Sequence, residues 1–502
     1  MVFQYLILNF YRPRVQKTQK SSVFYSVVSS VLVILCCAET LYAILIANFS
    51  PYLSNYSHYG WSESFEKTID ELEKSYILRD WKQIDFDSLR SELIPRVEKA
   101  EKDNDVEEFA LALYELKFYL NDGHVWVSGS DYSALNNVEM SFCGNDYGFS
   151  MFRDNTGKIL AVLTEESSEA EKYGIHDGIQ ITKWNCETVD EAAAKVRCFD
   201  TEYNFSYVEN EEIFQPVFLA GKGGDTVNVS FIDDNGDEKT VSLNKTGNYN
   251  SRLRKAIRKI YGYEIITSEN LFTCMLNEKC GYLRVSNEAL YGSDIKEILA
   301  MMNGEYPEFR EEMENKIQKL EDQGMDRMII DIRNNTGGYD VLSRTIASLF
   351  VEKPVVDECG YYKNGKYGLR DKPTLLGAAR WKDIPVVVLV NGETCSSGDC
   401  LAYWLSQGEN VQLFGNTYTW GNAQSIGGVI ILSDDLFEFR YPIFPSLSID
   451  YEPIVDPKSD RKSRIKLDFQ ITYDKEEVIR LFSDSAEDDV LNQALDYIMK
   501  EN

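Results

Sequence analysis

Two stretches of the sequence run from apolar residues into small polar ones, and both could support nucleophilic chemistry. Residues 327–338 read RMIIDIRNNTGG, and residues 385–399 read PVVVLVNGETCSSGD. A Gly-Gly pair after a buried strand lets backbone N–H groups point at a ligand. A serine at a helix N-terminus lies beside free N–H groups and could attack a carbonyl carbon, while those groups stabilise the oxyanion. The surroundings are not Gly-x-Ser-x-Gly, so an α/β-hydrolase elbow is excluded.

A serine nucleophile needs a base whose pKa lies near neutrality, which histidine supplies. The chain has three histidines, and His124 lies in the turn sequence NDGHVW. His176 lies in a turn that we expect to be exposed, and His58 follows an apolar N-terminal run, so both are expected to be incidental. A carboxylate would fix the histidine tautomer and stabilise the imidazolium.

The pattern of apolar residues predicts three regions after the N-terminus. Residues 62–120 carry apolar residues at helical spacing, and residues 138–243 show short strands separated by Gly, Asn and Asp turns, with a short helix from Val189. From Gly262 onward strands alternate with helices, which predicts an α/β core with largely parallel strands. The expected strands are 282–285, 327–333 and 385–390, and the expected helices are 307–323, 341–350 and 397–407.

The region of short strands resembles a PDZ domain. The resemblance rests on YGFS at 147–150, SEAEKYGI at 168–175 and GIQI at 178–181, which arrive in the order of that family. It implies that Tyr147, Gly148, Phe149 and Ser150 form the turn whose N–H groups bind a peptide carboxylate, and that the strand beside it accepts the peptide. The alternative is a small β domain that binds no peptide.

Taken together, the two strand-to-helix stretches resemble the C-terminal processing (tail-specific) peptidase family. Gly415 and the sequence TWG at 419–421 also fit, and the resemblance covers roughly Leu113 to the C-terminus. It implies an α/β core of the ClpP/crotonase-like type that follows a PDZ-like domain. It also implies Ser396 as the nucleophile.

By the same resemblance, the oxyanion hole is formed by backbone N–H groups. Those of Gly337 or Gly338 would act together with that of Ser397.

The chain departs from the members of this family that use a Ser–Lys dyad. Asn422 stands where those members carry lysine, and no lysine occurs between Lys382 and Lys458. A second branch, similar to the tricorn core peptidase, uses Ser, His and Glu. That resemblance implies His124 as the base and Glu452 as the acidic member, with the neighbouring Asp450 and Asp456 as alternatives to Glu452.

The N-terminus predicts a membrane anchor or a signal segment. Residues 23–49 are mostly apolar and carry no charged residue except Glu39, and they follow the basic residues Arg12, Arg14, Lys17 and Lys20. This arrangement places the N-terminus in the cytoplasm and the rest of the chain outside, either anchored in the membrane or secreted if the segment is cleaved. The net charge of −29 argues against nucleic-acid binding.

The expected domains are an anchor at 1–50, a helical region at 51–134, a PDZ-like domain at 135–250 and a peptidase core at 251–502. The leading hypothesis is an extracytoplasmic serine endopeptidase with PDZ-like recognition of peptide or protein substrates and no metal or other cofactor. The alternatives are a catalytically silent peptide-binding protein, a Ser–Lys peptidase with a relocated lysine, and a cysteine nucleophile at Cys395 or Cys400.

Overall fold

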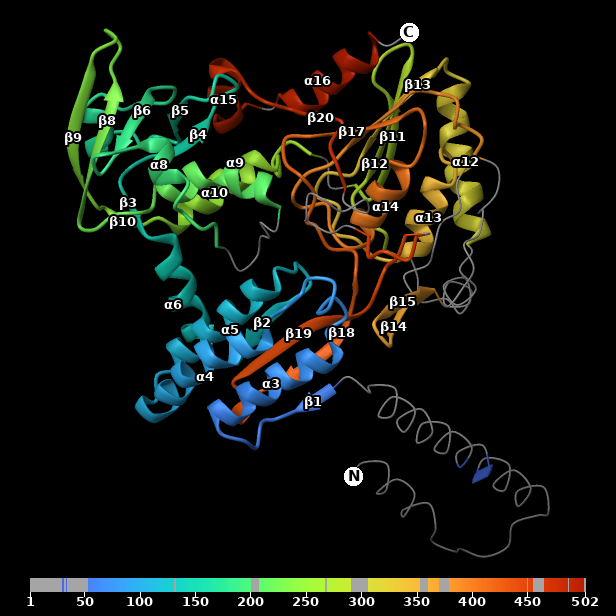
Figure 1. The fold of residues 1–502 in the computed structure, drawn as a ribbon. Coiled ribbons are helices and arrows are strands. Elements are labelled where there is room, and N and C mark those ends of the chain that lie inside the picture. The colour runs from blue at the N-terminus through green and yellow to red at the C-terminus, as the bar shows by residue number, and fades with distance from the viewer. Residues whose placement is uncertain are drawn as a thin grey trace, which may run out of the picture. The chain divides into compact units, whose positions relative to one another are not determined.

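The structure is a computed structural model, and within the chain residues 1–53 and 54–502 form separate units (Figure 1). Among the described residues, no helix is both long and apolar enough to cross a bilayer. The expected membrane segment lies outside the described residues, apart from three positions at 29, 30 and 33. The structure describes residues 29–30, 33, 53–130, 132–199, 207–266, 269–289, 306–352, 360–369, 379–448, 450–454, 465–485 and 487–500.

The expected helical region contains helices and also two strands, β1 (Leu53–Asn55) and β2 (Trp126–Gly129), of a four-stranded sheet. Strand β1 precedes helices α3 (Trp61–Ser75), α4 (Phe86–Asp103) and α5 (Val106–Leu120), which are followed by β2 and α6 (Tyr132–Cys143). Strand β2 pairs with β19 (Phe437–Phe444), which pairs in turn with β18 (Ser425–Ile431). The helical region therefore shares a sheet with a hairpin from the C-terminal half of the chain.

The β-rich region forms a sheet in the order β4-β5-β6-β8-β9. The sequence predicted short strands here and only one short helix, from Val189. The structure adds helix α9 at residues 208–219, which buries aromatic side chains at one edge of the sheet. The strands are β4 (Ser150–Arg153), β5 (Ile159–Val162), β6 (Gln180–Trp184), β7 (Glu187–Thr188), β8 (Thr226–Ile232) and β9 (Glu238–Asn244), with the small pair β3 (Asn145–Asp146) and β10 (Gly247–Asn248); the helices are α7 (Glu169–Lys172), α8 (Val189–Ala193), α9 (Val208–Leu219) and α10 (Asn250–Ile260).

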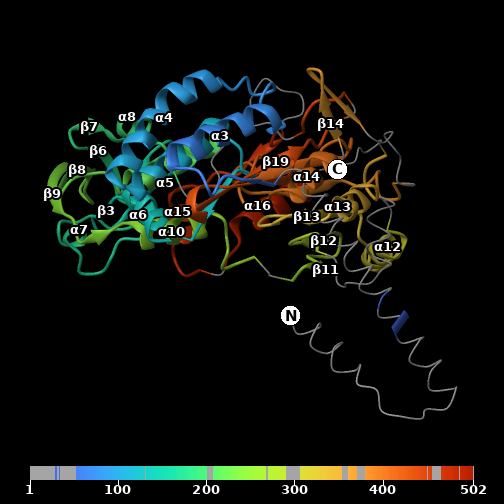
Figure 2. The ribbon, with the colours of Figure 1, turned by 90° about the horizontal axis from the view of Figure 1, so that it is seen from below.

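The α/β core contains a sheet in the order β11-β12-β13-β16-β17-β20, and its strands are parallel except for β11. This confirms the expectation of a largely parallel sheet. Helices α12 and α13 pack against each other, as Figures 1 and 2 show. The strands are β11 (Leu271–Met275), β12 (Cys280–Val285), β13 (Arg327–Asp331), β16 (Val386–Leu389), β17 (Val411–Gly415) and β20 (Phe469–Gln470), and the helices are α12 (Pro307–Glu321), α13 (Asp340–Ala347) and α14 (Ser397–Leu405).

The remaining elements lie around this core. The hairpin of β14 (Gly360–Lys363) and β15 (Lys366–Leu369) carries Tyr367, whose hydroxyl donates to the carbonyl of Ile77 in the helical region. A short helix η1 (Ser433–Asp435) joins β18 to β19. At the C-terminus, α15 (Lys475–Phe482) packs on β5 of the β-rich sheet, whereas α16 (Asp489–Ile498) packs on β16 and β13.

The register of the parallel sheet brings the two strand-to-helix stretches to one edge. Strands β13 and β16 are neighbours, and Asp331 pairs with Leu389. The residues that follow these two positions therefore leave the sheet side by side. Ligand sites of parallel α/β sheets form at this carboxyl end.

A buried ionic network fixes the end of β13. Asp331 is fully buried and accepts hydrogen bonds from Arg333, at 2.6 Å, and from the hydroxyl of Tyr282, at 2.8 Å. Arg333 also donates to Asp488, at 2.7 Å, just before α16, and the buried Arg284 donates to the Asp331 carbonyl at 3.0 Å. The network therefore joins β12, the end of β13 and the start of α16.

We expect Asp331→Ala to lower the free energy of unfolding by about 3–5 kcal/mol, because it leaves buried guanidinium groups without their carboxylate. The matched control is Asp326→Ala, which removes a half-exposed carboxylate 2.7 Å from Arg327 and should cost less than about 1 kcal/mol. Urea unfolding of both variants measures the difference. Equal losses would contradict a structural role for the network.

Candidate active site

Ser396 lies at the N-terminus of α14 in a strained backbone conformation. Its φ of 57° and ψ of −122° lie in a region that favours glycine, at a cost of about 1–3 kcal/mol. The conformation is held by hydrogen bonds from Ser396 N–H to the carbonyl of Asn422, at 3.2 Å, and from Cys400 N–H to the carbonyl of Ser396, at 3.1 Å. The side chain is half-buried, and its hydroxyl has no hydrogen-bond partner among the described residues.

The Gly-Gly pair contacts this serine directly. Gly337 has a φ of +80°, and a Cβ atom added there would lie 2.6 Å from the Cβ of Ser396. The side chain of Asn335 holds the loop, because its Oδ1 accepts a hydrogen bond from Gly337 N–H at 2.8 Å. The carbonyl of Asn335 accepts another from Cys395 N–H at 2.9 Å. The two stretches that the sequence singled out thus form one site.

Two backbone N–H groups beside Ser396 are available to bind an oxyanion. The sequence left Gly337 and Gly338 open, but the N–H of Gly337 already donates to Asn335. The N–H groups of Gly338 and Ser397 have no acceptor among the described residues, and Gly338 is exposed. The geometry therefore favours Gly338 with Ser397. The hydroxyl of Ser397 is directed elsewhere and donates to Asp340 at 2.6 Å.

His124 lies in a buried turn after α5. The helix ends at Leu120, and Asn121, with a φ of 43°, starts the turn. His124 N–H then donates to Asp122 Oδ1 at 2.9 Å. The ring nitrogen Nδ1 of His124 lies 2.6 Å from the carbonyl oxygen of Gln424. Because a carbonyl can only accept, Nδ1 carries the proton and Nε2 is left as the basic nitrogen.

The segment 422–424 contacts both the serine turn and the histidine turn. The carbonyl of Asn422 accepts from Ser396, its side-chain amide donates to Asp122, and the carbonyl of Gln424 binds His124. The structure therefore brings Ser396 and His124 to one short segment. It records no direct hydrogen bond between them among the described residues. Catalytic hydrogen bonds are often long in the absence of substrate.

Burial sets the protonation of the groups around this segment. Desolvation lowers the pKa of His124, whereas the charge of Asp122 and the bonds to Gln424 and Asn422 act in the opposite direction. The imidazole is therefore neutral at neutral pH, as a base must be. Burial also raises the pKa of Asp399 to about 8, so this carboxyl, which accepts a hydrogen bond from Asn422 N–H at 3.0 Å, is mostly protonated near pH 7.

The cysteines near the site are unsuited to nucleophilic attack. Burial, together with the nearby Asp399 and Glu393, raises the pKa of Cys395 well above its usual range. Only the thiolate is strongly nucleophilic, so a thiol held in its protonated form is inert. Cys400 is fully buried within α14. Neither residue supports the alternative of a cysteine nucleophile.

No hydrogen bond joins Glu452 to His124 among the described residues. Its backbone N–H donates to the Ser448 hydroxyl, at 3.3 Å, and its carbonyl accepts from Ser448 N–H at 2.8 Å. Burial raises the pKa of Tyr403, a residue of α14, to about 12, and the charges of Asp450 and Glu452 raise it further. These two carboxylates therefore lie close enough to Tyr403 for their charge to affect it. Asp456 lies outside the described residues.

The sequence reasoning missed the roles of Gln424, Asn422 and Asp122. Asp122 lies two residues before His124, and this spacing was a readable signal. The role of Gln424 left none, because its contact with His124 uses the backbone carbonyl that every residue has.

The residues expected to bind a peptide end are buried. Tyr147, Phe149 and Ser150 are at most 1% exposed. Gly148 N–H donates to Asp146 Oδ1 at 2.8 Å. These positions have partners within the chain.

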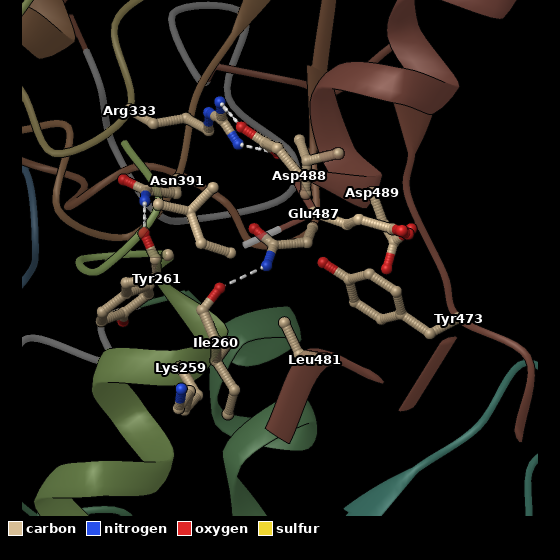
Figure 3. A pocket seen from close by; sticks show the side chains of 14 residues that line it. Lys259, Ile260, Tyr261, Arg333, Asn391, Tyr473, Leu481, Glu487, Asp488 and Asp489 are labelled. Carbon is tan, nitrogen blue, oxygen red and sulfur yellow. Dashed lines mark hydrogen bonds and ion pairs between the residues drawn. The ribbon is translucent and has the colours of Figure 1, made fainter. Parts of the chain in front are cut away.

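A pocket is lined by residues of both junctions but not by Ser396. Figure 3 shows Arg333 facing Asp488, and Asn391 donating to the carbonyl of Tyr261 at 3.1 Å. Neither Ser396 nor His124 lines this pocket. Arg333 and Asn391, one from each junction, therefore line this pocket and hold the junctions through their hydrogen bonds.

Comparison with known proteins agrees with this site. Residues 279–460, which include both junctions and Ser396, match the model of peptidase family S41. This region of the chain therefore resembles the peptidases of family S41. The S41 region ends after Glu452 but begins well after His124, so the histidine comes from outside it.

The S41 relatives include curated processing proteases. The chain is 24% identical over 287 residues to carboxyl-terminal-processing peptidase 3, chloroplastic, of Arabidopsis thaliana. The aligned region makes up 56% of this chain and 47% of that relative. It is 26% identical over 271 residues to carboxy-terminal processing protease CtpA of Bacillus subtilis, covering 53% and 44%. The matches thus span less than half the length of these relatives.

The fold of this chain has a counterpart among solved structures. Mature CPAF aligns with a TM-score of 0.53 and 12% identity, over 88% of this chain and 97% of CPAF. At this identity the likeness shows the fold alone.

We expect Gly337→Ala to lower the proposed activity at least about a hundredfold, because the new methyl group would overlap Ser396 and displace it. Gly365→Ala is the matched control. Gly365 has a similar φ of +76°, but a Cβ atom there would meet no other atom within 4 Å. Both variants carry the same kind of backbone strain, but only Gly337→Ala adds steric overlap with Ser396. A larger fall in kcat/KM for Gly337→Ala than for Gly365→Ala is therefore due to the overlap. A comparable loss in both would contradict the contact as the cause.

Proposed function

We propose that this chain is a serine endopeptidase in which Ser396 is the nucleophile and His124 is the general base. The observation that carries the proposal is the contact of Ser396 with the Gly-Gly loop, together with the segment 422–424 that it shares with His124. The match of residues 279–460 to the model of peptidase family S41 supports peptide-bond hydrolysis as the reaction. Because the chain matches less than half of its curated relatives, the activity rests on the site itself.

The proposed reaction uses the free groups of the site. Nε2 of His124 takes the proton from the Ser396 hydroxyl as the oxygen attacks the scissile carbonyl carbon, and the carbonyl oxygen becomes an oxyanion. The N–H groups of Gly338 and Ser397 bind this oxyanion. His124 then gives its proton to the departing amine, and water hydrolyses the acyl-enzyme by the same steps.

In this proposal the carbonyl of Gln424 takes the place beside Nδ1 that a triad carboxylate would take. The Gln424 side chain is clamped, because Nε2 donates to the Ile454 carbonyl at 2.9 Å and Oε1 accepts from Ser446 N–H at 2.8 Å. Glu452, the acidic member implied by resemblance to the tricorn branch, lies in the loop that provides this clamp. Its position supports an indirect role through the loop backbone.

The negative charge near the imidazolium is then that of Asp122. This residue is 3% exposed and also accepts a hydrogen bond from the hydroxyl of Tyr76 at 2.6 Å. Lys82 lies 3.8 Å from the same carboxylate. A buried carboxylate held in this way stabilises a cation formed beside it.

The proposed location is outside the cytoplasm, with the chain held by its N-terminal segment. The support is the basic and then apolar sequence of residues 12–49. The substrates are proposed to be proteins or peptides, in keeping with the S41 family. A second candidate, a catalytically silent peptide-binding protein, is favoured by the lack of a direct bond between Ser396 and His124.

Hydrolysis of a denatured protein decides between these two functions. We expect Ser396→Ala and His124→Ala each to lower kcat at least about a thousandfold, because the nucleophile and its base act as one unit. His176→Ala, which alters an exposed histidine, should leave the rate unchanged. Glu452→Gln should lower it by less than about tenfold. Wild-type activity that persists in both site variants would exclude the proposed pair.

The pH dependence tests the role of Asp122. Because burial lowers the pKa of His124 from 6.5, we expect the acid limb of kcat/KM to lie below pH 6.5. Asp122→Asn removes a charge that raises this pKa, so the limb should move to still lower pH while kcat falls. Asp87→Asn, at a fully exposed carboxylate, should move neither. An acid limb that stays in place in Asp122→Asn would contradict this role.

A further inference from the structure

The edge of the β-rich sheet is where the sequence places a peptide-binding groove. Strand β4 forms this edge, and the turn at residues 147–149 precedes it. In peptide-binding modules of this kind, a substrate adds to the edge strand while its terminal carboxylate meets N–H groups of the turn. Both places must be free for such binding.

The position of the added strand is filled by a helix of the same chain. Helix α9 packs directly against β4. Its side chains Phe214, Val217 and Phe218 are at most 1% exposed and belong to the same apolar cluster as Phe149 and Met151. A peptide strand could lie along β4 only if α9 moved away and exposed these side chains.

The position of the terminal carboxylate is filled as well. The carboxylate of Asp146 accepts the N–H of Gly148 at 2.8 Å. It also binds Arg252 Nε at 3.0 Å, and Arg252 further donates to the carbonyl of Leu163 and to Glu165 at 2.9 Å. The cation and the turn N–H that a peptide carboxylate would need are thus taken by an aspartate of the chain itself.

A buried hydrogen bond also joins the start of β4 to the residue before helix α10. The hydroxyl of Tyr249, immediately before α10, lies 2.6 Å from the Ser150 hydroxyl, and both residues are fully buried. Opening the edge of β4 would separate this pair inside an apolar environment. Four observations therefore indicate that the edge of β4 is closed to a peptide: the packing of α9, the bond of Asp146 to the turn, the bond of Arg252 to Asp146, and the buried hydroxyl pair.

We propose that the β-rich module does not read the C-terminal carboxylate of a substrate, because α9 and Asp146 occupy both parts of that site. The module is a fixed part of the fold, and protein substrates are chosen by an accessible, unfolded segment at Ser396 rather than by a free chain end. The second statement rests on the proposed peptidase function. The first does not.

A binding experiment tests the first statement without catalysis. The full chain with Ser396→Ala is titrated into two fluorescent peptides of identical apolar sequence, one with a free C-terminal carboxylate and one amidated. We expect dissociation constants that agree within about twofold, or no binding of either peptide. Tighter binding of the free carboxylate by tenfold or more would overturn the proposal.

A kinetic experiment tests the second statement. The wild-type chain is given an internally quenched substrate with the same two C-terminal forms, and we expect kcat/KM to agree within about twofold. A tenfold preference for the free carboxylate would overturn the statement. If neither form is cleaved, the peptidase function fails and the second statement fails with it, while the binding result still decides the first.

Discussion

The hydrogen bonds of residues 422–424 are the constraint on which the candidate active site depends. Ser396 comes from the α/β core and His124 from the helical region, and this segment contacts both. It leads directly into β18, and the β18–β19 hairpin pairs with β2 just after His124. The same part of the chain thus joins the two regions as a sheet and aligns their reactive groups.

Buried polar groups around the site are satisfied in different ways. Asp331 stays ionised because two arginines surround it, and their charges lower its pKa despite burial. Asp399 has no arginine beside it among the described residues, so burial raises its pKa to about 8 and it stays mostly neutral near pH 7. The loops that hold Ser396 therefore combine a charged anchor in the sheet with a neutral carboxyl beside the nucleophile. This arrangement leaves Asp122 as the carboxylate whose charge acts on the histidine.

The β-rich region shares a continuous apolar interior with the α/β core. Its apolar cluster continues into Ile329 and Val387 of the parallel sheet and into the C-terminal helices. Helix α15 packs on β5, so the chain returns to this region after completing the core. A module held in this way, with its edge strand covered by α9, fits a structural part better than a mobile binding domain.

The sequence by itself determined the local features. Apolar runs followed by small polar residues identified β13, β16 and the turns at Gly337 and Ser396, and the alternation of strands and helices indicated the parallel core, because local patterns govern such elements. Only the tertiary structure decided the partners. Gln424 binds His124 through a backbone carbonyl, and α9 packs against the edge strand β4. These contacts join segments far apart in the chain, and no residue type or spacing encodes which backbone group a side chain will meet.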